Sequence, residues 1–360
     1  MLAPVRPTNQ RKWRVPASLV LTVLVLAVVG VGCPCLRGPV NASPGLRWWL
    51  FSNFGADRIC PEMLKNGMGL RAQDRGPAIG RFFPTGCSID VNDETQTVVV
   101  NFIGTGYASM NLTGRVGFQC SASVEYGPDF YMGEDDLYVW GKMKRLVNGP
   151  KFELGYVENK LADVATQMTP LGTVANMFGN QITAGQLTQG FTVVENWDTE
   201  SKSFALGVIR PPQKPHTPYD VSEDENHTYA NETIEVAYNG RDYLGPFEVV
   251  NGDQRLLMKM FNQGPRVEVM VVDKKVGDMW REGYQQGRPL GPPPGPVLGG
   301  TVLEPNFESK VSFNLRPGFY YVVVDHTQYA GVVAPPPVSL LAPLSGPAAR
   351  ITYVAQLAEI

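Results

Sequence analysis

The stretch Arg115-Val-Gly-Phe-Gln-Cys-Ser-Ala-Ser-Val-Glu125 sets the expected fold. Its apolar residues occupy every second position and are Val116, Phe118, Cys120 and Ala122. Side chains of a β-strand point alternately to the two faces of a sheet, so these four would share one face. The stretch therefore predicts a strand of an antiparallel sheet that packs one face against a core.

Strand patterns extend from this stretch through the first part of the chain. They cover residues 97–103, 136–143, 152–157, 191–194 and 203–209. Residues 97–103 are β-branched and apolar, which predicts a strand covered on both faces. An apolar stripe at three- and four-residue spacing predicts short helices near residues 159–178. We therefore expect residues 48–210 to form an α+β domain with a curved antiparallel sheet and short helices.

A proline-rich and acidic segment, residues 211–229, separates this part from the next. It contains Pro211-Pro-Gln-Lys-Pro-His-Thr-Pro218 and Glu223-Asp-Glu225, a composition that favours an extended, solvated linker. Further strand patterns follow at residues 233–238, 246–250, 255–260, 266–272, 309–314, 318–324 and 351–355. Short strands joined by turns predict that residues 230–360 form an antiparallel β-sandwich without helices.

Three segments of this second part carry a resemblance to a known family. They are Gly245-Pro-Phe-Glu-Val249, Val267-Glu-Val-Met-Val-Val272 and Pro317-Gly-Phe-Tyr-Tyr-Val-Val-Val-Asp-His-Thr327. Residues 230–355 resemble bacterial relatives of the GOLD domain, a jelly-roll sandwich, although His326 stands where Asn is usual. The resemblance implies a binding or assembly module without a fixed ligand or catalytic residues. Candidate ligand contacts on its aromatic strand and the following loop are Phe319, Tyr321 and Tyr329.

The amino terminus has the pattern of an export signal. Four basic residues between positions 6 and 14 precede an uncharged apolar run at residues 17–32. The export machinery reads this arrangement, and the basic side stays in the cytoplasm. Residues 1–32 are therefore expected to be a signal or membrane anchor and residues 33–47 a tether. The expected location is the cell membrane or envelope, with everything after residue 32 outside the cytoplasm.

Residues just beyond this run suggest further contact with lipid. Gly32-Cys33 resembles a bacterial lipoprotein signal, which would place lipid on Cys33; cleavage and retention as an uncleaved anchor are the alternatives. Trp48, Trp49 and Phe51 are candidates for the membrane–water interface, where Trp is favoured. Entry of these rings into the core of the first domain is the alternative.

Three cysteines lie within the predicted first domain: Cys60, Cys87 and Cys120. In an exported chain one pair could form a disulfide and leave one thiol, and the sequence does not assign the pair. The sequence contains no Cys-x-x-Cys motif and no Cys/His cluster that predicts a metal site.

Composition and motifs exclude several classes of function. The net charge of −3 is not basic, so no nucleic-acid partner is expected. The three histidines lie at positions 216, 227 and 326, outside the predicted first domain. Gly-x-Ser-x-Gly and His-Glu-x-x-His motifs are absent from the sequence. No catalytic residue, cofactor or metal site is therefore expected.

These observations predict a non-enzymatic, membrane-anchored cell-envelope protein. Its exported β-rich domains would bind another envelope protein or component, or serve a structural role. One alternative is a lipid carrier at residues 48–210, with Met168, Met177 and Phe178 lining the cavity. A further alternative is an enzyme that acts on cell-wall carbohydrate, which would need two carboxylates across a groove.

Overall fold

The computed structural model describes residues 34–359 except 66, 72, 74–75, 111–113, 159–188, 197–201, 222–225 and 334–345. The predicted anchor at residues 1–32, Cys33, and the predicted helices near residues 159–178 lie outside the described residues. None of the helices that are described is both long and apolar enough to cross a membrane.

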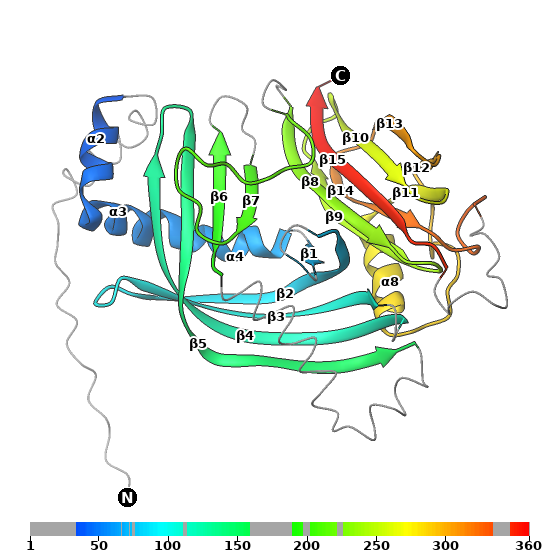
Figure 1. Ribbon diagram of the computed structural model, residues 1–360, viewed down its shortest axis with the longest axis horizontal. Helices are drawn as coiled ribbons and strands as arrows, with labels where there is room; N and C mark the ends of the chain where they lie inside the picture. The colour runs from blue at the N-terminus through cyan, green and yellow to red at the C-terminus, as the bar shows by residue number, and fades with distance from the viewer. Residues whose placement is uncertain are drawn as a thin grey trace, which may run out of the picture.

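The chain is mainly β, with a large curved sheet and few helices, as predicted (Figure 1). The first half of the chain contributes β1 (Met68–Arg71), β2 (Ala78–Asn92), β3 (Thr97–Met110), β4 (Gly114–Met132), β5 (Asp136–Val157), β6 (Phe191–Asn196) and β7 (Lys202–Leu206). The second half contributes β8 (His227–Val236), β9 (Arg241–Val249), β10 (Gln254–Gln263), β11 (Val267–Asp273), β12 (Gly299–Leu303), β13 (Phe307–Phe313), β14 (Gly318–Asp325) and β15 (Ala349–Glu359).

Two sheets contain these strands. The larger has 11 strands in the order β13-β10-β15-β8-β2-β3-β4-β5-β6-β7, with β1 paired to β2. The smaller has four strands in the order β12-β11-β14-β9. Strands from both halves of the chain thus share one sheet, which continues through a parallel contact at Ala78 of β2 and Ile234 of β8.

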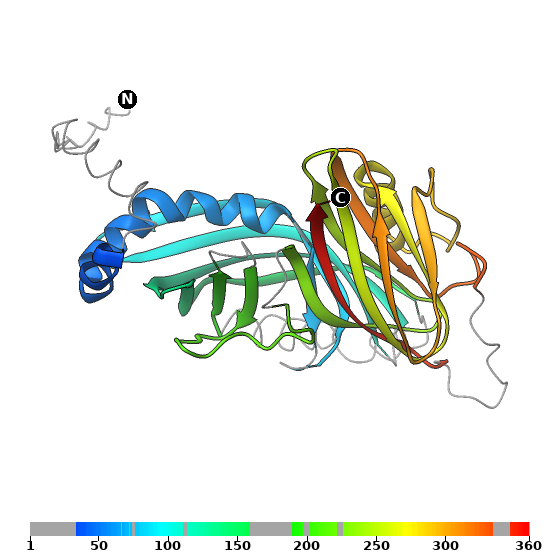
Figure 2. The same ribbon diagram turned by 90° about the horizontal axis from the view of Figure 1, so that it is seen from above.

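A helical rod lies along one face of strands β2 to β5 (Figures 1 and 2). It consists of α2 (Pro34–Ala42), α3 (Pro44–Leu50), the π-helical turn η1 (Phe51–Gly55) and α4 (Ala56–Lys65). The Ser43 side chain accepts a hydrogen bond from the Leu46 amide and caps α3, with Pro44 in its first turn. Arg47 also pairs with Asp129 of β4, Nε to Oδ1 at 2.7 Å.

The tether predicted for residues 33–47 is thus corrected, because most of this segment is helical and attached to the sheet. Asn41 binds β4 in addition, since its amide donates to the Met132 carbonyl at 2.8 Å and accepts from the Met132 amide at 3.0 Å. These contacts span more than 80 residues of sequence, which local patterns do not indicate.

The rod and the sheet enclose the core of the first half. Buried residues at this contact include Phe51, Phe82, Val98, Val100, Phe102, Phe118, Val124 and Phe130. The prediction that residues 97–103 are covered on both faces is wrong. Val98, Val100 and Phe102 face the rod, whereas Ile103 on the opposite face is 51% exposed. The rod covers only the face that carries Val98, Val100 and Phe102, so Ile103 on the other face stays in solvent.

The second half forms a core between its two sheets, built from residues such as Ile234, Leu256, Val269, Val322 and Ile351. It also contains a helix, α8 (Lys274–Gln285), so the expectation of strands alone is wrong. Asp273 caps α8 by accepting from the Val276 amide at 2.8 Å. Val276, Trp280 and Tyr284 repeat at four-residue spacing and are buried, a helical signal that the sequence does contain.

A buried ionic network centred on Arg81 joins β2 to the second half. Its guanidinium donates to both carboxylate oxygens of Asp242 on β9, at 3.1 and 3.0 Å, and to Oε1 of Glu232 on β8 at 2.9 Å. The Tyr107 hydroxyl donates to Asp242 and the Tyr353 hydroxyl to Glu232, each at 2.6 Å. Burial opposes ionisation of Glu232, but Arg81, Tyr353 and Arg71 outweigh it and hold its pKa below the ordinary value.

Cys60 of α4 and Cys87 of β2 form a disulfide, with Cα atoms 5.4 Å apart, and Cys120 remains a buried thiol. The bond ties the rod to the sheet. It closes a loop of 27 residues, which removes conformational freedom mainly from the unfolded chain.

We expect the variant Cys60→Ala/Cys87→Ala to lose about 3 kcal/mol of unfolding free energy, measured by urea denaturation under oxidising conditions. Cys120→Ala is the control, because its thiol is outside the bond, and we expect a cost of about 1 kcal/mol or less. Alkylation of Cys60 and Cys87 in the folded, unreduced protein would contradict the pairing.

The lowered pKa of Glu232 predicts a specific loss of stability in acid. A carboxyl whose pKa is lower in the folded state stabilises the protein above its unfolded pKa, about 4.3, and loses that contribution as pH falls through the folded pKa. Glu232→Gln should be less stable at neutral pH and should show a shallower acid decline than the wild type. Thermal unfolding between pH 3 and 7, with Glu94→Gln at an exposed turn as control, measures this. Parallel curves for wild type and Glu232→Gln would refute it.

Candidate functional site

Strands β2 to β5 present a polar face on the side opposite the rod. Four residues form a line across it, one from each strand: Ser88 pairs with Asn101, Asn101 with Ser123, and Ser123 with Asn148. We call these four residues the polar row. Because paired residues of adjacent strands point to the same face, the four side chains stand side by side.

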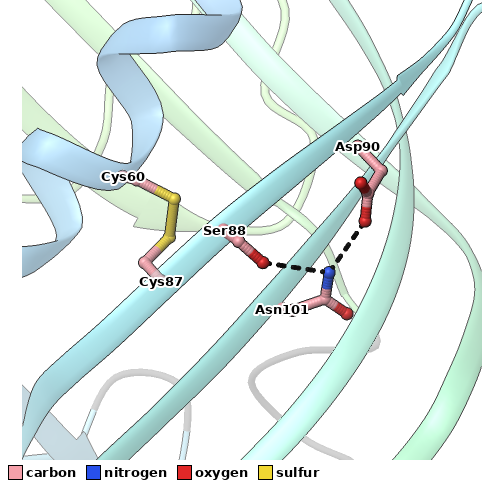
Figure 3. Close-up of a disulfide and its surroundings, with 5 residues drawn as sticks. All are labelled: Cys60, Cys87, Ser88, Asp90 and Asn101. Carbon is pink, nitrogen blue, oxygen red and sulfur yellow. Dashed lines mark hydrogen bonds between the residues drawn. A yellow bond between two sulfur atoms is a disulfide. The ribbon is translucent and has the colours of Figure 1, made fainter.

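Hydrogen bonds orient the amide groups of the polar row. The Asn101 amide nitrogen donates to Oγ of Ser88 at 3.3 Å and to Oδ2 of Asp90 at 3.0 Å (Figure 3). The Asn148 amide nitrogen donates to Oγ of Ser123 at 3.4 Å. Figure 3 also shows the Cys60–Cys87 disulfide on the other side of β2, toward the rod. The amides are thus held by their neighbours while they remain at the surface.

A groove of about 480 Å³ lies over the polar row. This polar groove is lined by Gly86, Cys87, Ser88, Asn101, Phe102, Ile103, Ser121, Ala122, Ser123, Asn148, Gly149 and Lys151. Its second row, next to the polar row on the same face, is Gly86, Ile103, Ser121 and Lys151. The lining therefore combines uncharged hydrogen-bonding groups with one exposed aliphatic side chain and one ammonium group.

Irregular strand pairing shapes both ends of the polar groove. The register of β2 and β3 shifts between Pro84 and Gly86. The register of β4 and β5 shifts on both sides of Ser123: Gly149 and Pro150 of β5 together oppose Ala122, and Val147 is an extra residue between the partners of Ser123 and Val124. Such bulges bend a strand and redirect its side chains, and they are common beside functional sites.

Two carboxylates, Asp90 and Glu125, lie in the row next to the polar row on the same face, beyond the lining of the polar groove. Glycoside cleavage uses a pair of carboxyl groups, and no carboxylate is among the described residues that line it. Glu125, one row away, accepts from Arg145 and from Thr97, and these bonds lower its pKa. On the rod side, burial raises the pKa of the Cys120 thiol to about 12, so it does not supply a thiolate. Within the described ranges, no three His, Cys, Asp or Glu residues gather as a metal site.

The residues predicted to contact membrane or ligand lie elsewhere. Phe51 is buried against the sheet, so it is not available to a membrane. The indole N–H of Trp48 donates to Asp93 at 3.0 Å, whereas Trp49 is exposed. Tyr321 is buried beneath α8 and its hydroxyl donates to Asp278 at 2.8 Å, which removes it as a ligand contact. Phe319 and Tyr329 are exposed, and β14, which contains Phe319, belongs to the smaller sheet.

The residues predicted to line a lipid cavity are not described by the structure. Met168, Met177 and Phe178 all lie within the range 159–188, outside the described residues. One face of the curved sheet packs against the rod, through Phe51, Ile59 and Met63. The lipid-carrier alternative therefore stays a prediction.

Sequence reasoning did not identify the polar row. Polar residues at alternate positions of residues 97–103 and 115–125 do indicate an exposed face. Alignment of Ser88 with Asn148, however, depends on the bulges, because one extra residue shifts every pairing beyond it.

Comparisons with known proteins do not identify a family for this chain. No family model matches the chain, so the resemblance to GOLD domains stays a prediction, and no curated protein matches it. One solved structure with some similarity is a glycoside hydrolase family 43 arabinoxylan arabinofuranohydrolase from Bacillus subtilis in complex with cellotetraose. Sequence identity is 7%, the TM-score is 0.21, and the match covers 76% of this chain and 66% of that chain, slightly under two thirds of its length.

This finding corrects one prediction. The similar structure is a carbohydrate-active enzyme, which is contrary to the predicted non-enzymatic role, and we withdraw that role. A TM-score of 0.21 is too low to assign this chain a fold or an activity. The functional argument therefore rests on the geometry of the polar groove.

Proposed function

We propose that this protein binds carbohydrate in the polar groove on strands β2 to β5. The observation that carries the proposal is the polar row, in which amide and hydroxyl groups alternate across four neighbouring strands. Amides and hydroxyls both donate and accept hydrogen bonds, as the hydroxyls of a sugar do. A surface of this kind is complementary to an uncharged ligand rich in hydroxyl groups.

The spacing of the polar row also suits a chain of sugars. Adjacent strands lie about 4.8 Å apart, so a ligand that crosses the strands meets a new polar side chain at each step. This step is similar to the length of one sugar ring. The row would therefore contact successive sugars of an oligosaccharide that lies across the sheet.

The second row supplies the other two groups that sugar recognition needs. Ile103 is 51% exposed and offers an apolar surface to the C–H face of a ring. Lys151, at the far side of that row, can donate up to three hydrogen bonds to hydroxyl or carboxylate oxygens.

Replacement of Asn101 tests the proposal. We expect Asn101→Leu to weaken binding about tenfold, because it removes one or two hydrogen bonds worth about 1 kcal/mol each. Isothermal titration calorimetry with a panel of soluble cello-, xylo-, chito- and galacturono-oligosaccharides measures the affinity. Asn101 is at the surface of a long strand, so circular dichroism should show an unchanged fold.

Gln119→Ala is the matched control, because Gln119 is exposed on β4 and lies outside the lining of the polar groove. We expect this variant to bind as the wild type does. The proposal fails if no oligosaccharide of the panel binds to the wild type, or if Asn101→Leu and Gln119→Ala bind equally well.

A further inference from the structure

The helical rod has an exposed apolar surface that faces away from the sheet. Leu46, Trp49, Phe54 and Leu64 are between 37% and 43% exposed, and we call these four residues the apolar ridge. Large apolar side chains gathered on one side of an element, rather than scattered singly, usually mark a contact surface.

The π-helical turn η1 assembles the centre of the apolar ridge. Trp49 and Phe54 are five residues apart, and their rings meet edge to face with centroids 5.7 Å apart. A π-helical turn bonds residue i to i+5, which aligns such a pair on one side of the helix. The same turn directs Phe51 into the core, so the rod has one face for the sheet and another for its surroundings.

The position of the ridge in the sequence indicates what covers it. The uncharged run of residues 17–32 ends two positions before α2 begins at Pro34, and α3 follows at Pro44. The sequence predicts that this run partitions into a bilayer, which would place the adjoining rod next to the membrane surface. Trp favours this boundary, where its ring is buried and its N–H stays hydrated.

Charges beside the ridge favour a lipid surface over a charged partner. Asp57, Arg58, Glu62 and Lys65 are exposed on α4 and balance in sign, and Lys65 pairs with Glu62 at 2.9 Å. The balance gives no preference for anionic lipid, since electrostatic attachment needs clustered Lys or Arg. Apolar contact alone would therefore hold the apolar ridge at a lipid surface.

We infer that the apolar ridge lies against a lipid bilayer, with the indole of Trp49 in the membrane interface. The polar groove is on the opposite face of the sheet from the rod, so this contact leaves it open to the surroundings. The inference does not depend on what the groove binds.

Fluorescence quenching by brominated lipid tests this contact. The full chain with Trp13→Phe, which removes the indole before the uncharged run, is reconstituted in phosphatidylcholine vesicles with or without brominated acyl chains. We expect bromine-dependent quenching in this parent and loss of at least half of it after Trp49→Phe. Trp140→Phe, on β5, is the matched control and should quench as the parent does.

Two results would overturn the inference. One is absence of quenching in the Trp13→Phe parent, as expected if a second copy or another protein covers the ridge. The other is equal quenching in the Trp49→Phe and Trp140→Phe variants. We also expect the same quenching with and without phosphatidylglycerol, because the ridge is apolar and its flanks are balanced. Quenching that requires the anionic lipid would contradict apolar attachment.

Discussion

The arrangement of the two halves depends on one buried cation. Arg81 lies where β2 meets β8, and only 3% of its side chain is exposed. A buried guanidinium is stable only if its donors have partners, and these come from Asp242, Glu232 and the Gly67 carbonyl. Since the two carboxylates belong to different sheets, the cation can be satisfied only when both sheets are in place. The network thus specifies the one orientation in which the long strands continue into the second half.

This anchorage gives the long sheet two faces with different roles. The rod covers one face and is fixed by the Cys60–Cys87 bond and by Arg47, so the curvature of β2 to β5 is supported along their length. The opposite face holds the polar groove, and α8 packs on the same face farther along the strands, with Tyr284 against Tyr107. The membrane contact proposed for the rod and the binding proposed for the polar groove would therefore use different surfaces.

Alternation in the sequence was enough to predict most strands, because a period of two is a local property. Alternation could not predict features that depend on contacts between residues far apart in the sequence. The sequence left Trp48 and Trp49 open between interface and core. In the structure these consecutive residues of α3 differ, because Trp48 is partly buried with its N–H on Asp93, whereas Trp49 is exposed and its ring meets Phe54. Residues 97–103 appeared covered on both faces because β-branched residues conceal which face is exposed. Helix α8 was missed because strong strands flank its four-residue repeat, and the polar row because bulges set its register.

The composition of the polar groove is unusual for a merely solvated face. Exposed positions of strands favour Thr, Tyr and other β-branched or aromatic residues, whereas Asn and Gly are depleted. Yet the middle of β2 to β5 places Gly86, Asn101, Asn148 and Gly149 together with three serines on one face. The asparagines and glycines among them weaken the local preference for a strand. A conflict between local preference and fold that is confined to one place on a molecule is typical of a functional site, and it supports recognition at this face of the sheet.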